Sequence, residues 1–317
     1  MADIGGVNVA PKMEERAFPM LRLDGASGSF MPEPVLFDFH PVYGREMGLS
    51  KGEPLANAVF FKLDDKQAIP IDAFPSPLYL LVLRGTLSVK TPAKATTTFT
   101  AGGFFHVPSP SSSHATLAAN KGSPVLALAL IKNAISPSSF FTLPKDRTNV
   151  SEDFRFTALV VTPAGGSAVS DDHAVGKLDS LWKLKGADVV ASTPYETLAI
   201  SFCDAVPTLT APLHPAYSKY VNWTTFLGPG RAQFQVTEGN PPNRNVGAGD
   251  IIWFEDSEGA GHGYRVVGAH GVSQVFVTLK REVRKWGVGK SGFEAGLHGL
   301  SWEQVEEKKK LDRDGKL

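Results

Sequence analysis

Short apolar and β-branched runs, separated by clusters of Gly, Pro and Ser, dominate the pattern along this chain. In the first half they lie at 58–63, 78–83, 86–90, 103–108 and 125–131. In the second half they lie at 154–161, 198–202, 220–227, 232–236, 250–254, 264–267 and 274–279. Runs of this length, bounded by turn residues, are typical of β-strands. Helical periodicity is confined to 179–185 and the polar tail, so the sequence predicts an all-β protein of sandwiches or barrels.

The same pattern occurs twice. Each copy has a hairpin that turns at a glycine, then a second glycine turn, and then a histidine. The first copy uses Gly85, 102–103 and His114, and the second uses Gly228, 249–250 and His262. A repeat of roughly 140 residues is far too long for a solenoid unit and indicates two similar domains.

We therefore predict two barrels in tandem, flanked by less regular ends. The predicted limits are an N-terminal arm at 1–32, a first barrel at 33–148, a second barrel at 149–285, and a tail at 286–317 with a short polar helix. The arm is expected because 1–32 is rich in Gly, Pro and charge. Ser301 with Gln304 forms a capping-box pattern for the tail helix.

Composition narrows the class of protein further. Apolar residues make up 42% of the chain, and 32 Lys and Arg balance 32 Asp and Glu, so no net charge favours nucleic acid or a membrane surface. No segment approaches the ~20 apolar residues of a membrane span, and we expect a cytoplasmic protein. The single cysteine, Cys203, excludes an internal disulfide and lies in an apolar run, which favours a buried, inert thiol.

The motif around each late histidine resembles the second motif of the cupin superfamily, which begins at Gly-Asp, crosses a strand, and ends at a histidine after a turn. Residues 249–262 (GDIIWFEDSEGAGH) and 102–114 (GGFFHVPSPSSSH) carry the resemblance, which covers most of the chain from about residue 55. It implies a bicupin, with two double-stranded jelly-roll barrels.

The first cupin motif, which carries two histidines and a glutamate, is degraded in both halves. Leu78 and Val221 occupy the place of the glutamate, while His214 lies near the place of the first histidine. The first barrel therefore keeps at most His114, and the second keeps His214 and His262. A mononuclear site needs three or four N or O ligands. We expect no metal; the alternative is Fe or Mn on His214 and His262, with a third donor from Tyr217, Glu255, Asp256 or His270.

The second barrel is the predicted site of chemistry. His262 and His214 are the candidate proton carriers, because the pKa of imidazole lies near neutral pH. Tyr217 or Glu255 is the candidate hydrogen-bond donor to developing charge. The candidate substrate contacts are Trp223, Trp253, Phe226, Tyr264 and His114. Strand alternation places Trp253 and Phe254 on opposite faces, so one of them faces the interior.

Every one of these side chains also has a structural interpretation. The aromatic residues can form core, His214 can mark a strand entrance, His262 a turn, and His114 a surface loop.

Three functions remain open at this point. The leading hypothesis is an enzyme that transforms a small, partly apolar or aromatic metabolite by metal-independent acid–base chemistry, as an isomerase, cyclase, dehydratase or lyase. The second is an Fe- or Mn-dependent cupin dioxygenase or decarboxylase. The third is a non-catalytic binding bicupin. The expected partner is a small-molecule substrate, with no nucleic acid or membrane, and the breadth of the superfamily favours secondary metabolism. Monomer and homodimer are both open, because jelly-roll edges invite pairing.

Overall fold

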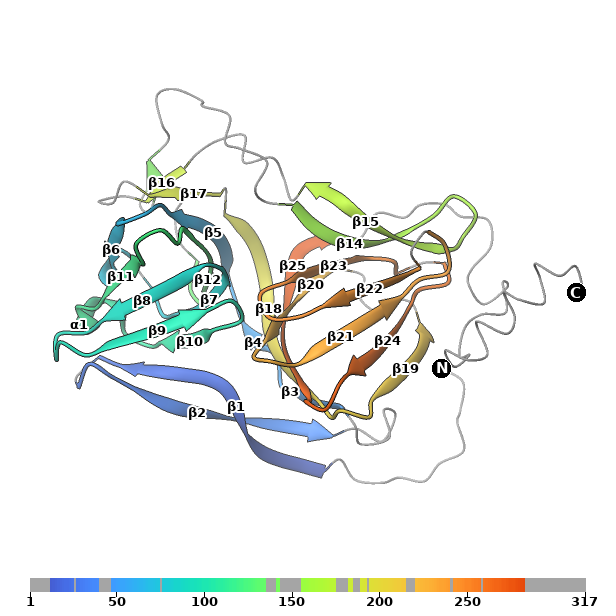
Figure 1. Cartoon of the computed structure of the whole chain (residues 1–317), viewed down its shortest axis with the longest axis horizontal. Coiled ribbons are helices and arrows are strands. Elements are labelled where there is room, and N and C mark those ends of the chain that lie inside the picture. Colours follow the sequence, from blue (N-terminus) through green and yellow to red (C-terminus); the bar gives the residue numbers. More distant parts are fainter. Residues whose placement is uncertain are drawn as a thin grey trace, which may run out of the picture.

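A computed structural model describes residues 12–25, 27–39, 47–74, 76–134, 141–142, 155–174, 182–184, 189–192, 194–214, 220–239, 242–257 and 259–282. The described part is almost entirely β-structure, in two barrels that lie side by side (Figure 1). This confirms the all-β prediction. No helix in these ranges has the length and apolar character that a membrane crossing requires.

The first barrel is closed by two facing sheets. One has the order β5-β12-β7-β10, and its strands are β5 (Asn57–Leu63), β7 (Leu78–Arg84), β10 (Phe104–Val107) and β12 (Val125–Ile131). The other has the order β6-β11-β8-β9, with β6 (Ala68–Pro70), β8 (Thr86–Lys90), β9 (Thr96–Thr100) and β11 (Thr116–Ala119). The short helices η2 (Ile71–Ala73) and α1 (Pro110–Ser113) lie in its connections.

The second barrel repeats this arrangement. Its large sheet has the order β18-β25-β20-β23-β14, with β14 (Arg155–Val161), β18 (Tyr195–Ala205), β20 (Tyr220–Leu227), β23 (Ile251–Glu255) and β25 (Val272–Glu282). Its small sheet has the order β19-β24-β21-β22, with β19 (Thr210–His214), β21 (Arg231–Gln235), β22 (Asn243–Val246) and β24 (His262–Val267). Strand β15 (Ser167–Ala174) forms a hairpin with β14.

The N-terminal segment is not an arm, and the prediction for 1–32 is wrong over its described part. Strands β1 (Lys12–Asp24) and β2 (Ser29–Phe39) form a long hairpin, and β1 pairs in parallel with β10 as β14 pairs in parallel with β23. The hairpin thus occupies the place in the first repeat that β14–β15 occupies in the second. Its buried face is apolar at alternate positions, such as Phe18, Met20, Phe37 and Phe39, a pattern that the Gly, Pro and charge content masked.

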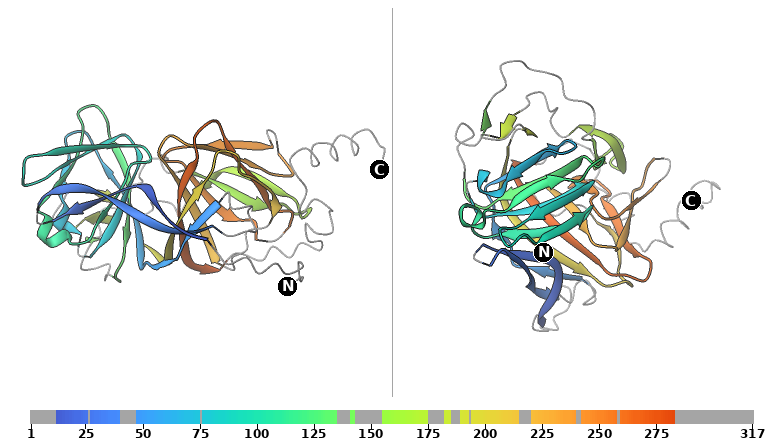
Figure 2. Two further views of the ribbon diagram at one scale, coloured as in Figure 1. Left: turned by 90° about the horizontal axis from the view of Figure 1, so that it is seen from below. Right: turned by 60° about the vertical axis from the view of Figure 1, so that its left-hand side comes forward.

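The two barrels are joined edge to edge and share a core. Strands β3 (Met47–Ser50), β4 (Glu53–Pro54) and β5 all pair with β18, so within the described residues 17 strands form one sheet. The β1–β2 hairpin lies along both barrels (Figure 2). Aromatic side chains fill the space between the barrels, where Trp223 packs against Phe60, Tyr195 and Trp253 at ring-centroid distances of 5.7 Å. This shared core fixes one barrel against the other.

The connection between the barrels also corrects one prediction. The expected helix at 179–185 is in part strand β16 (Trp182–Leu184), which lies between β13 (Phe141–Thr142) and β17 (Val190–Ala191). Pairing with neighbouring strands overrides the local helical pattern there. The predicted tail helix at 286–317 lies outside the described residues.

The repeated glycines hold turns where a side chain does not fit. Gly85 has φ +81° and Gly249 has φ +82°, the left-handed region that favours glycine. A Cβ at Gly85 would collide with the carbonyl oxygen of Pro124, and one at Gly249 would collide with the carbonyl oxygen of Leu83 in the other barrel. The second contact shows that the glycine turns of the two barrels also pack against each other.

Candidate functional site

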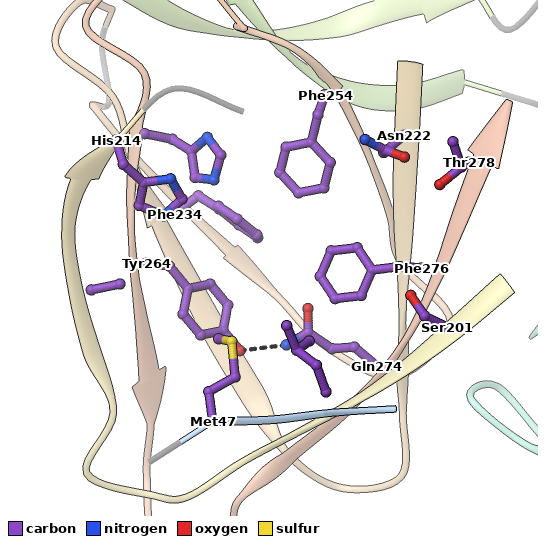
Figure 3. A pocket seen from close by; sticks show the side chains of 13 residues that line it. Met47, Ser201, His214, Asn222, Phe234, Phe254, Tyr264, Gln274, Phe276 and Thr278 are labelled. Atoms are coloured by element: carbon purple, nitrogen blue, oxygen red, sulfur yellow. Dashed lines mark hydrogen bonds between the residues drawn. The ribbon is translucent and has the colours of Figure 1, made fainter. Parts of the chain in front are cut away.

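The second barrel contains a partly open cavity of about 410 Å³ between its two sheets (Figure 3). Three faces contribute to it. The small sheet presents the two histidines, Phe234 and Tyr264. The large sheet presents Phe254, Phe276 and four polar side chains, those of Ser201, Asn222, Gln274 and Thr278. Met47 and Leu49 come from β3, which precedes the first barrel in the chain. A cavity of this size, with apolar walls and a few polar groups, is typical of a small-molecule site.

His214 and His262 are directly opposed on neighbouring strands. His214 ends β19, His262 begins β24, and their Cα atoms are register partners in the antiparallel pair. Both side chains therefore project from the same face of the small sheet, into the cavity, with ring centroids 4.8 Å apart. The structure thus brings together the two histidines that the motifs singled out.

The side chain of Asp256 forms a hydrogen bond with the ring of His262. The two atoms Nδ1 of His262 and Oδ2 of Asp256 are 2.6 Å apart, and Asp256 is completely buried. A carboxylate only accepts hydrogen bonds, so it selects the tautomer in which Nδ1 carries the proton. Nε2 is then the nitrogen through which His262 exchanges a proton with a ligand.

A turn with two glycines in the left-handed region places this pair. Between β23 and β24 the chain passes through Gly259 and Gly261, with φ of +79° and +70°. A Cβ at Gly259 would lie 2.6 Å from the carbonyl oxygen of Gly165, so only glycine fits. Ala260 donates its amide hydrogen to the same oxygen, and the Ser167 hydroxyl donates to the carbonyl of Gly261. The β14–β15 hairpin therefore fixes the turn that carries Asp256 and His262.

Aromatic rings surround the histidines. The ring of His262 lies 5.0 Å from that of Phe254 and 5.5 Å from that of Phe234. Tyr264 packs on Phe234 at 5.3 Å, and its hydroxyl accepts a hydrogen bond of 2.8 Å from Nε2 of Gln274. Burial raises the pKa of Tyr264 well above its ordinary value of 10. Its hydroxyl therefore keeps its proton, and with it the capacity to donate to a ligand.

Two predicted aromatic contacts and one predicted acid lie on the wrong face of the large sheet. Asn222 faces the cavity, so its neighbour Trp223 must face the other way, and it packs between the barrels with Trp253. Glu255 follows Trp253 by two residues and shares its face. It accepts a 3.0 Å hydrogen bond from Trp253 Nε1 and lies 3.9 Å from Arg281. Trp223 and Trp253 thus pack between the barrels, and Glu255 lies on the same face of the large sheet as Trp253. The interior residue of the 253–254 pair is Phe254.

The remaining predicted residues have mixed positions. Phe226 faces the interior but lies beneath the cavity, where it packs against Phe234 at 6.2 Å. His114 is exposed at the C-terminal end of α1, with φ +45°, and belongs to the other barrel. Tyr217 lies outside the described residues.

Within the part of the chain that the structure describes, the donor set around the histidines does not fit a mononuclear metal; Tyr217, another predicted donor, lies outside that part. His214 and His262 supply two nitrogen atoms, and the carboxylate nearest to them, Asp256, is already bonded to His262 Nδ1. Glu255 points away and His270 is an exposed turn residue. Among the described residues, no cluster of three His, Cys, Asp or Glu side chains could hold an ion. Two donors are fewer than the three or four that such a site requires.

Several lining residues escaped the sequence analysis. Asn222 alternates with Trp223 and Val221 on a strand, and this polar–apolar alternation was the available signal for its inward position. From the sequence, Asp256 was a possible metal donor or, with Glu255, an acid at a strand end, and its hydrogen bond to His262 was not predicted. Met47 and Leu49 reach the cavity through long-range pairing of β3 with β18, which no local pattern encodes.

No protein-family model and no curated protein matches this chain. Solved structures are similar to it at low identity. A cupin 2 conserved barrel domain protein from Leptotrichia buccalis is 12% identical, over 74% of this chain and 88% of its own, with a TM-score of 0.34. A putative glyoxylate induced protein from Pseudomonas aeruginosa is 13% identical, over 76% and 83%, with a TM-score of 0.33. Oxalate decarboxylase from Bacillus subtilis, described with Mn(II) centres, is 13% identical, over 75% and 69%, with a TM-score of 0.24.

These neighbours include cupin-barrel proteins, which is the superfamily that the glycine and histidine motifs resemble. The fold itself rests on the pairings within this chain, where each large sheet faces a small sheet of four strands around one core. The two barrels are tandem double-stranded jelly rolls, as the duplicated motif predicted.

Proposed function

We propose that the second barrel catalyses metal-independent proton transfer on a small, partly apolar organic molecule, as in an isomerase, cyclase, dehydratase or lyase. His262 acts as the base through Nε2, and His214, opposite it on β19, returns or receives the proton. One well-placed proton carrier contributes about 10²–10⁴-fold to a rate. Two such groups at one end of a cavity give the elements of a proton relay.

Asp256 has the role of a positioning residue. Its hydrogen bond to Nδ1 keeps the His262 ring in one tautomer and one orientation, and its negative charge stabilises the imidazolium that forms when Nε2 takes a proton. The aromatic walls formed by Phe234, Phe254 and Phe276 hold the substrate and exclude water from the reacting atoms.

The burial of Asp256 is the observation that carries this proposal. The residue is 0% exposed, and its Oδ1 has no hydrogen-bond partner among the described residues. A buried carboxylate with one unsatisfied oxygen is costly to stability. Its one hydrogen bond goes to His262. Costly groups of this kind are typical of functional sites, where orientation matters more than stability.

A deuterium screen tests the proposal. Wild-type protein would be incubated in D₂O with pooled small ketones, enones and hydroxy compounds, and mass spectrometry would detect deuterium gain at carbon or a change of isomer. We expect conversion of at least one compound, reduced about 10²–10⁴-fold in His262→Ala. The matched control is His114→Ala, the motif histidine of the first barrel, which should retain full activity.

Activity that survives in His262→Ala, with the variant folded by circular dichroism, would contradict the proposal. Tight binding of a compound that wild-type protein never converts would instead favour the non-catalytic alternative. That alternative shares the same cavity but needs no proton exchange.

A further inference from the structure

The cavity of the second barrel has two chemically different ends. The histidines lie on the small sheet, whereas Asn222, Ser201 and Thr278 lie on the large sheet at the other side of the aromatic rings (Figure 3). Asn222 and Thr278 are register partners on β20 and β25. Nδ2 of Asn222 donates to the carbonyl oxygen of Tyr220 at 3.2 Å, which orients the amide. This end therefore offers an amide oxygen and two hydroxyl groups, all uncharged.

The cavity wall between the ends is apolar and uncharged. Its central rings are Phe254 and Phe276, and Asn222 is the register partner of Phe254 across β20 and β23. Among the described lining residues none is Asp, Glu, Lys or Arg. A ligand with two charges would lose hydration without gaining a partner for each charge, which weakens its binding. The wall thus selects against dianions and polyphosphates.

The volume limits the size of the ligand. About 410 Å³ holds roughly 14 water molecules at their liquid volume of about 30 Å³ each. A molecule with one or two rings fills that space, and flat rings match walls built from four aromatic side chains.

From these three features we infer that the substrate is an uncharged, planar aromatic or conjugated molecule with an oxygen function at each end. The proton-exchanging end lies between His214 and His262, and the distal oxygen is bound by Asn222 and Thr278. This inference rests on the proposed function only for its histidine end. The distal end makes Asn222 and Thr278 specificity-determining residues.

Binding of four probes, measured by isothermal titration calorimetry on the full chain, tests this inference without requiring turnover. The probes are 4-hydroxyacetophenone, with oxygen at both ends; acetophenone, with oxygen at one end; terephthalate, a dianion of similar outline; and oxalate. We expect 4-hydroxyacetophenone to bind with a Kd below about 1 mM, acetophenone about 3- to 10-fold more weakly, and neither dianion measurably.

Substitutions locate the distal end. Asn222→Leu and Thr278→Val keep side-chain volume but remove polar atoms, and each should weaken 4-hydroxyacetophenone about 3- to 10-fold while changing acetophenone less than about 2-fold. The matched control, Asn245→Leu, lies on the exposed outer side of the small sheet and should change neither.

Three results would overturn the inference: no binding of any probe, binding of terephthalate as tight as that of 4-hydroxyacetophenone, or equal effects of the substitutions on both neutral probes. Failure of the proposed function has a different signature. In that case the probes bind as expected, yet His262→Ala changes no conversion. Conversely, His262-dependent turnover of a dianion would retain the function and remove this substrate class.

Discussion

The two barrels share one topology but differ in what fills them. Inside the first, the facing sheets bury a cluster of apolar side chains such as Phe61, Leu80, Phe105 and Leu117, all fully buried. Inside the second, the same two-sheet frame leaves a cavity of about 410 Å³ lined by histidine, asparagine and hydroxyl groups. The jelly-roll fold alone therefore specifies no site, because the residues that face the interior decide whether the barrel is filled by side chains or leaves a ligand cavity.

The strand pair that carries the histidines shows the difference most clearly. In the second barrel, His262 at the start of β24 pairs with His214 of β19. In the first barrel, β11 and β6 take the places of β24 and β19, and there Thr116 at the start of β11 pairs with Pro70. The motif histidine of that barrel, His114, precedes the strand and is exposed. Displacement by two residues thus removes an imidazole from the interior.

The largest expected effect comes from a substitution beside the histidines of the second barrel. Asp256→Asn keeps the size of the side chain but no longer requires the proton on Nδ1 of His262. We expect kcat for any substrate found in the deuterium screen to fall about 10²–10⁴-fold, with KM nearly unchanged. A purely structural role would instead lower the melting temperature and leave kcat per folded molecule intact.

Truncation of one large ring in each barrel tests the difference in packing. Phe61 is fully buried in the first barrel and packs on Phe74 at 5.8 Å, so Phe61→Ala should cost about 3–5 kcal/mol of unfolding free energy. Phe276 borders the cavity and is only half-buried, so Phe276→Ala should cost less than about 2 kcal/mol. Urea unfolding measures both. Equal losses would mean that the second barrel is packed as tightly as the first.

The labelling rate of the Cys203 thiol tests how far the cavity of the second barrel extends. Its side chain is fully buried on β18, and burial raises the pKa of the thiol above its ordinary value of 9. Native protein at pH 8 should therefore react with a thiol reagent at least about tenfold more slowly than unfolded protein. Absorbance of the released chromophore follows the rate. If native and unfolded protein were labelled equally fast, the cavity would extend past Gln274 and expose Cys203 on β18 to the reagent.

The smallest expected effect, on thermal stability, concerns the hydrogen bonds that Glu53 accepts from Lys132 and Tyr79. Burial alone would raise the pKa of Glu53, but hydrogen bonds of 2.9 Å from Lys132 and Tyr79 outweigh it and hold the pKa below the ordinary 4.5. A carboxylate with a lowered pKa stabilises the fold above pH 4.5, and that stabilisation is lost as the pH falls further.

Glu53→Gln should therefore lower the melting temperature slightly at pH 7, and the difference from wild type should shrink as the pH falls below 4.5. Because Glu53 is 44% exposed, solvent screening keeps the difference small. A difference that grows as the pH falls would contradict the assigned sign.

The sequence predicts the repeat better than it predicts the faces of the strands. Turn glycines such as Gly85 and Gly249 are dictated by backbone sterics, so they mark the barrels without any knowledge of packing. Which neighbour points inward depends on register, and a shift of one residue exchanges the two faces. This is why Trp223 was expected in place of Asn222, and Glu255 in place of Asp256. The hairpin β1–β2 was missed because the Gly, Pro and charge content of 1–32 masks the alternating apolar positions of its buried face.

The central claim is that the second barrel holds an imidazole fixed by Asp256 for proton exchange, and ¹⁵N NMR of the histidine rings tests it most directly. At a pH where His262 is neutral, its ring should carry the proton on Nδ1, and Asp256→Asn should abolish that preference. A proton on Nε2 in the wild type, or a ring that behaves like exposed His114 in both proteins, would contradict the account.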